Sequence, residues 1–157
     1  MTLESPGIVA TEPQSVATIR LCVPWAEMRH VMMPGLSELR AAVAAQGIGA
    51  DGAWFTYHFR MPTDTLDFAI CVPVVSPPTQ IGRVESMLLP AETVVRATMR
   101  GDYSGLAAAW GTLRDWVAAN GHSIGPAFWE SYIVGLETSA DPADWRTELN
   151  WPLLVAE

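Results

Sequence analysis

Glu130 is the residue in this sequence whose type and setting best suit chemistry. It lies in the run AFWESYIV at residues 127–134, which is rich in aromatic and β-branched residues, as a β-strand usually is. Alternation along such a strand places Phe128, Glu130 and Tyr132 on one face. A carboxylate held among aromatic rings is costly to bury unless a proton, a cation or a polar ligand becomes its partner. We therefore expect Glu130 to bind a ligand, with Phe128 and Tyr132 beside it.

Trp54 and His58 are further candidates, because they are four residues apart in another strand-like run. Alternation puts both side chains on one face, with Thr56 between them. We expect this face to point into a ligand pocket. The alternatives are ordinary core packing for Trp54 and, for His58, a histidine that is partly exposed or has satisfied hydrogen bonds.

Other kinds of site find no support in the residue pattern. The histidines His30, His58 and His122 are scattered, without the spacing of metal ligands. All nine basic residues are arginine, which excludes Schiff-base chemistry on lysine and a phosphate-binding P-loop. Ser131 faces away from Glu130 and no G-x-S-x-G elbow is present. We expect no metal and no cofactor.

Composition narrows the class of protein. The 157 residues, half of them hydrophobic, fit one domain with a sizeable core. A net charge of -8 argues against nucleic acid as a partner. No apolar stretch approaches the length of a membrane span, and the N-terminus lacks the pattern of a signal peptide. We expect a cytoplasmic protein with a flexible tail at residues 1–14 and a single domain at residues 15–157.

An internal repeat divides this domain. The run LDFAICVPVV at residues 66–75 matches WRTELNWPLL at residues 145–154, so that Pro73 falls on Pro152. Upstream, the aromatic run that begins at Ala53 matches the run that begins at Ala127. Trp54 therefore corresponds to Phe128, Thr56 to Glu130 and His58 to Tyr132.

Each half also contains one amphipathic helix, expected at residues 34–46 and 104–120. Proline or serine near the start and a glycine after the end, Gly47 or Gly121, are usual boundary signals. The apolar stripes have helical spacing and consist of Leu36, Leu39 and Val43 in the first helix and Leu106, Trp110, Leu113 and Val117 in the second. Trp110 and Trp116 suit a ligand box in principle, but we interpret both as core residues.

These elements predict an α+β fold. The unit is strand, helix, strand, strand, present at about residues 15–75 and 82–155, with the Pro- and Gly-containing stretch 76–82 between the copies. Each unit buries its helix on one sheet face. We expect the helices on one face of the sheet and a ligand groove on the other.

Four motifs resemble the GyrI-like small-molecule-binding domain family, which includes the effector-binding part of BmrR-type and Rob-type multidrug regulators. They are DFAICVPV at 67–74, LPAETVVRATMRGDYSGLAAAW at 88–110, FWESYI at 128–133 and WRTELNWPL at 145–153. The resemblance covers roughly residues 15 to 155. It implies two pseudo-symmetric halves, with Glu130 as the family's central glutamate, which meets cationic aromatic ligands.

Two further residues are interpreted through this resemblance. The family usually has an aromatic residue two positions before the last proline, and Asn150 occupies that position here. The resemblance thus implies that an amide replaces one stacking ring of the ligand site. Tyr103, in the G-x-Y motif, is interpreted as a structural residue that fixes the start of the second helix.

The resemblance leaves more than one function open. The first is a stand-alone protein that binds aromatic or amphipathic compounds, cations among them, for drug sequestration or sensing. The alternative is a hydrolase of reactive electrophiles such as cyclopropanoid genotoxins, with Glu130 as general acid or base. A third is an inhibitor that binds another protein. Monomer and dimer both stay open.

Overall fold

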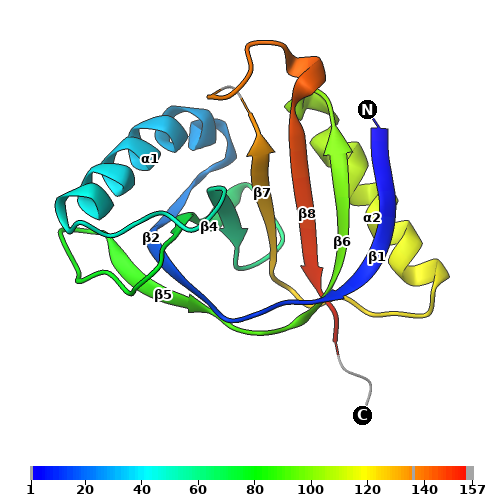
Figure 1. Ribbon diagram of the computed structural model, residues 1–157. Coiled ribbons are helices and arrows are strands. Elements are labelled where there is room, and N and C mark those ends of the chain that lie inside the picture. The colour runs from blue at the N-terminus through cyan, green and yellow to red at the C-terminus, as the bar shows by residue number, and fades with distance from the viewer. Residues whose placement is uncertain (1, 136, 155–157) are drawn as a thin grey trace. The chain divides into compact units, whose positions relative to one another are not determined.

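The computed structural model describes residues 2–135 and 137–154, which form eight β-strands and two α-helices (Figure 1). The strands pair antiparallel within each of two compact units. The first unit comprises Glu12–Ala91, and the second comprises the residues up to Thr11 together with those from Glu92 onward. The predicted α+β class is confirmed.

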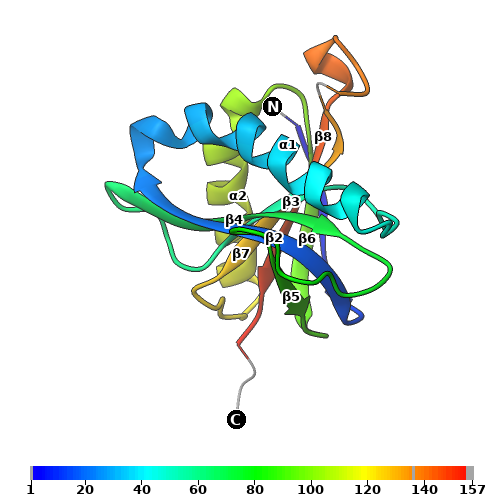
Figure 2. The ribbon, with the colours of Figure 1, turned by 90° about the vertical axis from the view of Figure 1, so that its left-hand side faces the viewer.

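The first unit contains four strands in the order β3-β4-β2-β5. Their bounds are β2 Gln14–Pro24, β3 Phe55–His58, β4 Thr65–Pro73 and β5 Glu85–Leu89. Helix α1 (Met28–Ala45) follows a 3-10 turn at Trp25–Glu27 and lies over β2 and β4 (Figure 2). Alternate residues of these two strands, Ile19 and Ile70 among them, form a core with the buried stripe of α1.

The start of α1 differs from the prediction. The helix begins at Met28, six residues before Pro34, and so contains this proline in its interior. The predicted stripe is nevertheless buried, and Gly47 ends the helix with a positive φ of 67°. Gly35 packs so closely on β4 that a Cβ atom there would lie 2.5 Å from Cδ1 of Ile70. Glycine at this position therefore sets the distance between helix and sheet.

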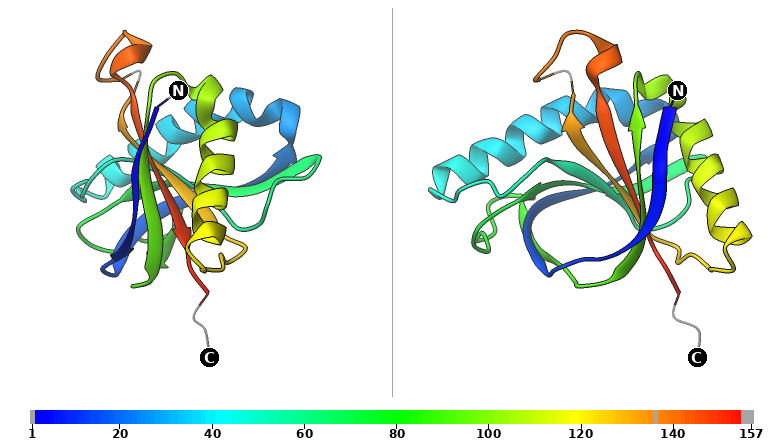
Figure 3. Two further views of the ribbon diagram at one scale, coloured as in Figure 1. Left: turned by 90° about the vertical axis from the view of Figure 1, so that its right-hand side faces the viewer. Right: turned by 45° about the vertical axis from the view of Figure 1, so that its right-hand side comes forward.

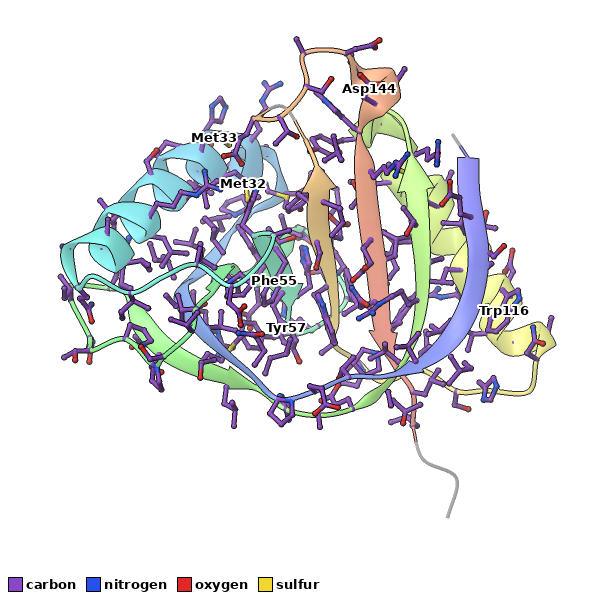
Figure 4. All side chains as sticks on the ribbon, in the orientation of Figure 1. Met32, Met33, Phe55, Tyr57, Trp116 and Asp144 are labelled. Carbon is purple, nitrogen blue, oxygen red and sulfur yellow. The ribbon has the colours of Figure 1, made fainter. Side chains whose placement is uncertain are left out.

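The second unit repeats this arrangement with the strand order β1-β6-β8-β7. Its strands are β1 Thr2–Ala10, β6 Thr93–Arg100, β7 Phe128–Val134 and β8 Arg146–Pro152. Helix α2 (Leu106–Ala119), preceded by a 3-10 turn at Tyr103–Gly105, lies along one face of these strands (Figure 3). A third 3-10 turn, Pro142–Asp144, precedes β8. Leu113 and Val117 of α2 are buried in the core, and Trp116 is partly buried against it. Figure 4 labels Trp116 on α2.

The expectation of a flexible tail is wrong for most of residues 1–14. Thr2–Ala10 form strand β1, which pairs antiparallel with β6, and Glu4 forms an ion pair with Arg100. The register shifts between Glu4 and Gly7, so that Pro6 lies at an irregularity of an edge strand, where a proline is tolerated. The prediction of a tail rested on the charged residues, prolines and glycine of this stretch, namely Glu4, Pro6, Gly7, Glu12 and Pro13. Met1 lies outside the described residues.

The unit boundaries also differ from the predicted halves. β5 precedes β6 in the chain but pairs with β2, so it belongs to the first unit and not to residues 82–155. β1 precedes β2 but pairs with β6. The repeated unit is therefore strand, helix, strand, strand, as predicted, with an edge strand added from outside it. Thr11 and Glu92, in the connections after β1 and β5, are hydrogen-bonded to each other.

Candidate functional site

The carboxylate of Glu130 is buried in the second unit and accepts two hydrogen bonds. The indole Nε1 of Trp110 donates to Oε1 over 2.7 Å, and the hydroxyl of Tyr132 donates to Oε2 over 2.9 Å. Only 7% of Glu130 is exposed. Since Trp110 belongs to α2, Glu130 lies on the face of β7 that this helix covers.

This placement corrects the expectation that Glu130 lies on the face without a helix. Phe128, Glu130 and Tyr132 do share one face, because Phe128 also contacts Trp110, with ring centroids 4.8 Å apart. Alternation tells which residues share a face but does not tell which face the helix covers. On this face, two neutral donors of its own unit, Trp110 and Tyr132, meet the two carboxylate oxygens.

Glu130 has no counter-charge in the described part of the chain. Each carboxylate oxygen meets a neutral donor, and no described arginine or histidine forms an ion pair with it. Burial raises the pKa of Glu130, and the hydrogen bonds from Trp110 and Tyr132 offset part of that rise. The site therefore holds a carboxyl group that a proton or an incoming cation would stabilise.

Aromatic rings flank this carboxyl group on two sides. On one side, Trp151 contacts Trp110 and Phe128, at centroid distances of 5.2 and 5.6 Å. On the other side, Tyr103 contacts Tyr132 edge-on at 5.7 Å and stacks on Trp145 at 4.7 Å. Rings in such arrangements offer both apolar area and the negative faces that attract cations.

Asn150 is not brought together with Glu130. It is fully buried on the opposite face of β8, since the neighbouring Leu149 is the residue that pairs with Glu130. Its amide oxygen accepts a hydrogen bond of 2.7 Å from Arg96, and its amide nitrogen donates to Glu148 over 3.2 Å. The ring that joins the aromatic group comes instead from the next residue, Trp151.

Trp54 and His58 lie in the first unit, on the α1 side of β3. His58 pairs with Phe68 across the strands and stacks on its ring at 5.7 Å. Burial lowers the pKa of His58 to about 4, so the imidazole is neutral at pH 7. Trp54 is partly buried against the same core. That these residues share one ligand site with Glu130 stays a prediction.

The residues between them on β3 point the other way. Phe55 and Tyr57, which Figure 4 labels, pair with Cys71 and Ala69, whereas the core residues Ile70 and Phe68 pair with Thr56 and His58. The predicted parity of this strand is therefore correct. As with Glu130, its candidate residues face the helix of their own unit.

Sequence reasoning missed three residues around Glu130, namely Trp110, Trp151 and Tyr103. Trp110 belongs to the apolar stripe of α2 and was interpreted as a core residue. One signal pointed further, because a buried tryptophan normally needs an acceptor for its N–H and an acidic residue is a strong one. No comparable signal distinguished Tyr103.

Within residues 2–135 and 137–154, no group of three or more histidine, cysteine, aspartate or glutamate side chains is arranged to hold a metal ion. Neither α-helix of that part is long and apolar enough to span a membrane.

Residues 5–154 match the sequence profile of the GyrI-like small molecule binding domain, and the chain belongs to this family. The match spans both units and includes β7 with Glu130. No curated protein sequence matches the chain significantly.

Solved structures show the same fold. The C-terminal domain of EcmrR is 24% identical with a TM-score of 0.84, and the match covers 97% of this chain and 98% of that domain. In an EcmrR–DNA complex, the chain spans only 58% of the EcmrR chain, with a TM-score of 0.85 and 24% identity over 97% of its own length.

Two less similar structures are a ligand-bound protein and a hydrolase. SAV2435, solved bound to tetraphenylphosphonium, is 8% identical with a TM-score of 0.65, covering 96% of this chain and 94% of that one. A hydrolase from Listeria innocua is 9% identical with a TM-score of 0.61, covering 95% and 91%. At these identities the likeness establishes the fold alone.

Proposed function

We propose that this protein binds aromatic or amphipathic cations at Glu130, and that it sequesters or senses them in the cytoplasm. The observation that carries the proposal is the buried carboxyl group of Glu130, which has aromatic rings on two sides and no counter-charge among the described residues. Membership of a small-molecule-binding family supports it.

Charge favours a cation as the ligand. A buried carboxylate without a counter-charge is unfavourable, and a cation that replaces its missing partner recovers part of that cost. The net charge of -8 adds a weak attraction for cations over the whole molecule. That SAV2435, a protein of the same fold, binds tetraphenylphosphonium makes this compound a suitable first probe.

A second candidate function is hydrolysis of a reactive electrophile. It is favoured by the raised pKa of Glu130 and by the Tyr132 hydroxyl on its carboxylate, because a carboxyl group with a pKa nearer neutrality serves as general acid or base. In that case Glu130 would pass a proton to the leaving oxygen or nitrogen of the substrate, or take one from an attacking water. The fold is shared with a hydrolase from Listeria innocua.

The test is a titration of tetraphenylphosphonium against tryptophan fluorescence, in the wild type and in Glu130→Gln. Trp110 donates to Glu130 directly, so ligand binding there should change its emission. Loss of the charge should weaken binding of the cation about tenfold or more. Exposed Glu85 on β5 provides the matched control, and Glu85→Gln should bind as the wild type does.

The two candidate functions separate on turnover. A binding protein gives stoichiometric quenching and leaves the compound intact. A hydrolase consumes an electrophilic substrate in excess over protein, and Glu130→Gln should then retain most of the binding and lose the turnover. If Glu130→Gln changes neither binding nor turnover, Glu130 is structural and both functions are wrong.

A further inference from the structure

Tyr103 occupies a rigid backbone position next to the Glu130 site. It opens the 3-10 turn before α2, where the Asp102 side chain accepts a hydrogen bond of 2.8 Å from the amide of Ser104. On the other side, the amide of Gly101 donates to the carbonyl oxygen of Trp145 over 2.9 Å. These bonds fix the direction in which the Tyr103 side chain leaves the chain.

The ring of Tyr103 is held as firmly as its backbone. It stacks on Trp145 at a centroid distance of 4.7 Å, with 29° between the ring planes, and meets Tyr132 edge-on at 5.7 Å. Trp145 is itself buried, and its indole N–H donates to the carbonyl oxygen of Ser139 over 3.0 Å. The phenol is therefore placed in advance, and little conformational entropy is lost if it binds a ligand.

The hydroxyl of Tyr103 is uncommitted. Tyr103 is half-buried, and its hydroxyl makes no hydrogen bond with any residue of the described chain, whereas the hydroxyl of Tyr132 is used on Glu130. Burial and then the charge of Glu130 raise the pKa of Tyr103, so the phenol stays protonated and is a donor at neutral pH.

Gly135 protects the position of this hydroxyl. A Cβ atom at Gly135 would lie 2.9 Å from the Tyr103 hydroxyl oxygen, closer than such atoms approach. Any larger residue at 135 would push the phenol aside. Gly135, which directly follows β7, thus permits the phenol to extend past the end of the strand, although φ there is not positive and would allow other residues.

We infer that the Tyr103 hydroxyl is a specificity determinant, which donates a hydrogen bond to an acceptor oxygen carried by the ligand. The inference rests on the proposed function and defines its ligand class more narrowly. The preferred compound is a cation with an aromatic body and a carbonyl or ether oxygen on that body. Its positive charge lies toward Glu130 and its oxygen toward Tyr103.

A purely structural role predicts something different for the hydroxyl. The ring alone makes the contacts with Trp145 and Tyr132, so phenylalanine would serve equally well for packing. A hydroxyl without a protein partner gains its hydrogen bond from water or from a ligand. The hydroxyl therefore contributes to affinity only for a ligand that carries an acceptor for its hydrogen bond.

The experiment compares two probes that differ by one acceptor. They are tetraphenylphosphonium and its analogue with one 4-acetylphenyl ring, titrated against wild type, Tyr103→Phe and Gly135→Ala. Tyr103→Phe retains the ring and removes only the hydroxyl. Tyr57→Phe, in the first unit, is the control for loss of a tyrosine hydroxyl elsewhere.

Tyr103→Phe should bind the acetyl analogue about three- to tenfold more weakly than the wild type does, which corresponds to one net hydrogen bond. Its affinity for tetraphenylphosphonium should be unchanged. Gly135→Ala should reduce the preference for the acetyl analogue in the same direction.

Equal weakening for both probes, or no change for either, would overturn the assignment of Tyr103 while leaving the proposed function intact. If neither probe binds the wild type but both leave it folded, the proposed function itself is wrong and the inference about Tyr103 falls with it.

Discussion

Glu130 is a residue that the folded state holds at an energetic disadvantage. Burial raises the pKa of Glu130 from 4.5, so this carboxyl group ionises at a lower pH in the unfolded chain than in the folded protein. A group with a raised pKa stabilises the fold fully below its unfolded pKa, and that stabilisation is lost as the pH rises through the folded pKa. Above the folded pKa, the buried charge of Glu130 destabilises the folded state.

Glu130→Gln should therefore become more stable, relative to the wild type, as the pH rises above 4.5, the ordinary pKa of the carboxyl group. Each kcal/mol gained corresponds to about 2–4 °C in Tm for a chain of this size. Thermal unfolding of both proteins over that pH range measures the difference, in which pH effects shared by the two proteins cancel. A difference that does not vary with pH would mean that the Glu130 carboxyl is not desolvated.

His58 gives the opposite pH dependence. Its folded pKa of about 4 lies below the ordinary 6.5, because burial disfavours the imidazolium. The unfolded chain takes up the proton first, so the contribution to stability is complete above pH 6.5 and is lost as the pH falls toward 4. The loss amounts to roughly 3 kcal/mol over the whole range.

Urea unfolding of the wild type and of His58→Gln between about pH 7 and pH 4.5 measures this contribution. On acidification, the free energy of unfolding should decrease much less in the variant than in the wild type. Exposed His122 supplies the control, since His122→Gln should leave the pH dependence as it is. An unchanged slope in His58→Gln would show that other groups cause the acid sensitivity.

For single residues, the sequence predicts which side chains share a strand face better than it predicts which side of the sheet that face lies on. Strand alternation correctly placed Phe128, Glu130 and Tyr132 on one face, and Trp54 with His58 on another. The side of the sheet that the helix covers depends on packing, which a period of two does not contain. The role of Trp110 depends on a contact between residues 20 positions apart, which no local pattern reveals.

At the scale of elements, the contact between α1 and β4 depends on Gly35. Glycine inside a helix normally costs up to about 1 kcal/mol relative to alanine, so helix propensity alone favours Gly35→Ala. Here the new methyl group would meet Cδ1 of Ile70, which is fully buried. Overpacking of this kind costs about 1–3 kcal/mol, so we expect Gly35→Ala to destabilise the protein.

Removal of the opposing atom should reverse the sign. Ile70→Val removes Cδ1 and by itself costs about 0.5–1.5 kcal/mol. In that background Gly35→Ala should stabilise the protein. A double-mutant cycle measured by chemical denaturation should therefore show that the double variant is more stable than the sum of the two single effects predicts. Additive effects of the two substitutions would contradict the contact. Gly111→Ala is a suitable control, because a Cβ atom at Gly111 in α2 meets nothing within 4 Å.

The ends of elements show where local signals suffice. Gly47 and Gly121 correctly marked the two helix ends, because both residues adopt a positive φ that favours glycine. Pro34 misplaced the start of α1, since tertiary packing here retains a proline inside the helix. β1 was missed because its pairing with β6 joins residues about 90 positions apart in sequence.

At the scale of the whole molecule, β1 completes the second unit from a distant part of the chain. Deletion of residues 2–10 should expose the edge of β6 and destabilise the second unit, while the first unit retains its own strands. Hydrogen exchange should show lost protection in β6 and β8 and largely unchanged protection in β2 and β4. Glu4→Gln removes only the exposed ion pair with Arg100 and should cost less than about 1 kcal/mol. Equal loss of protection in both units would show that they unfold together.

The position of β1 also has a consequence for the order of events on the ribosome. Residues 12–91 are contiguous and can assemble as soon as β5 has emerged from the exit tunnel. β1 emerges before all of them, yet its partner β6 is translated only afterwards. At about 5–20 residues per second, this strand waits several seconds with its backbone groups unpaired. The proline and the charged residue that it carries, Pro6 and Glu4, are features that keep such a waiting strand from joining a neighbouring nascent chain.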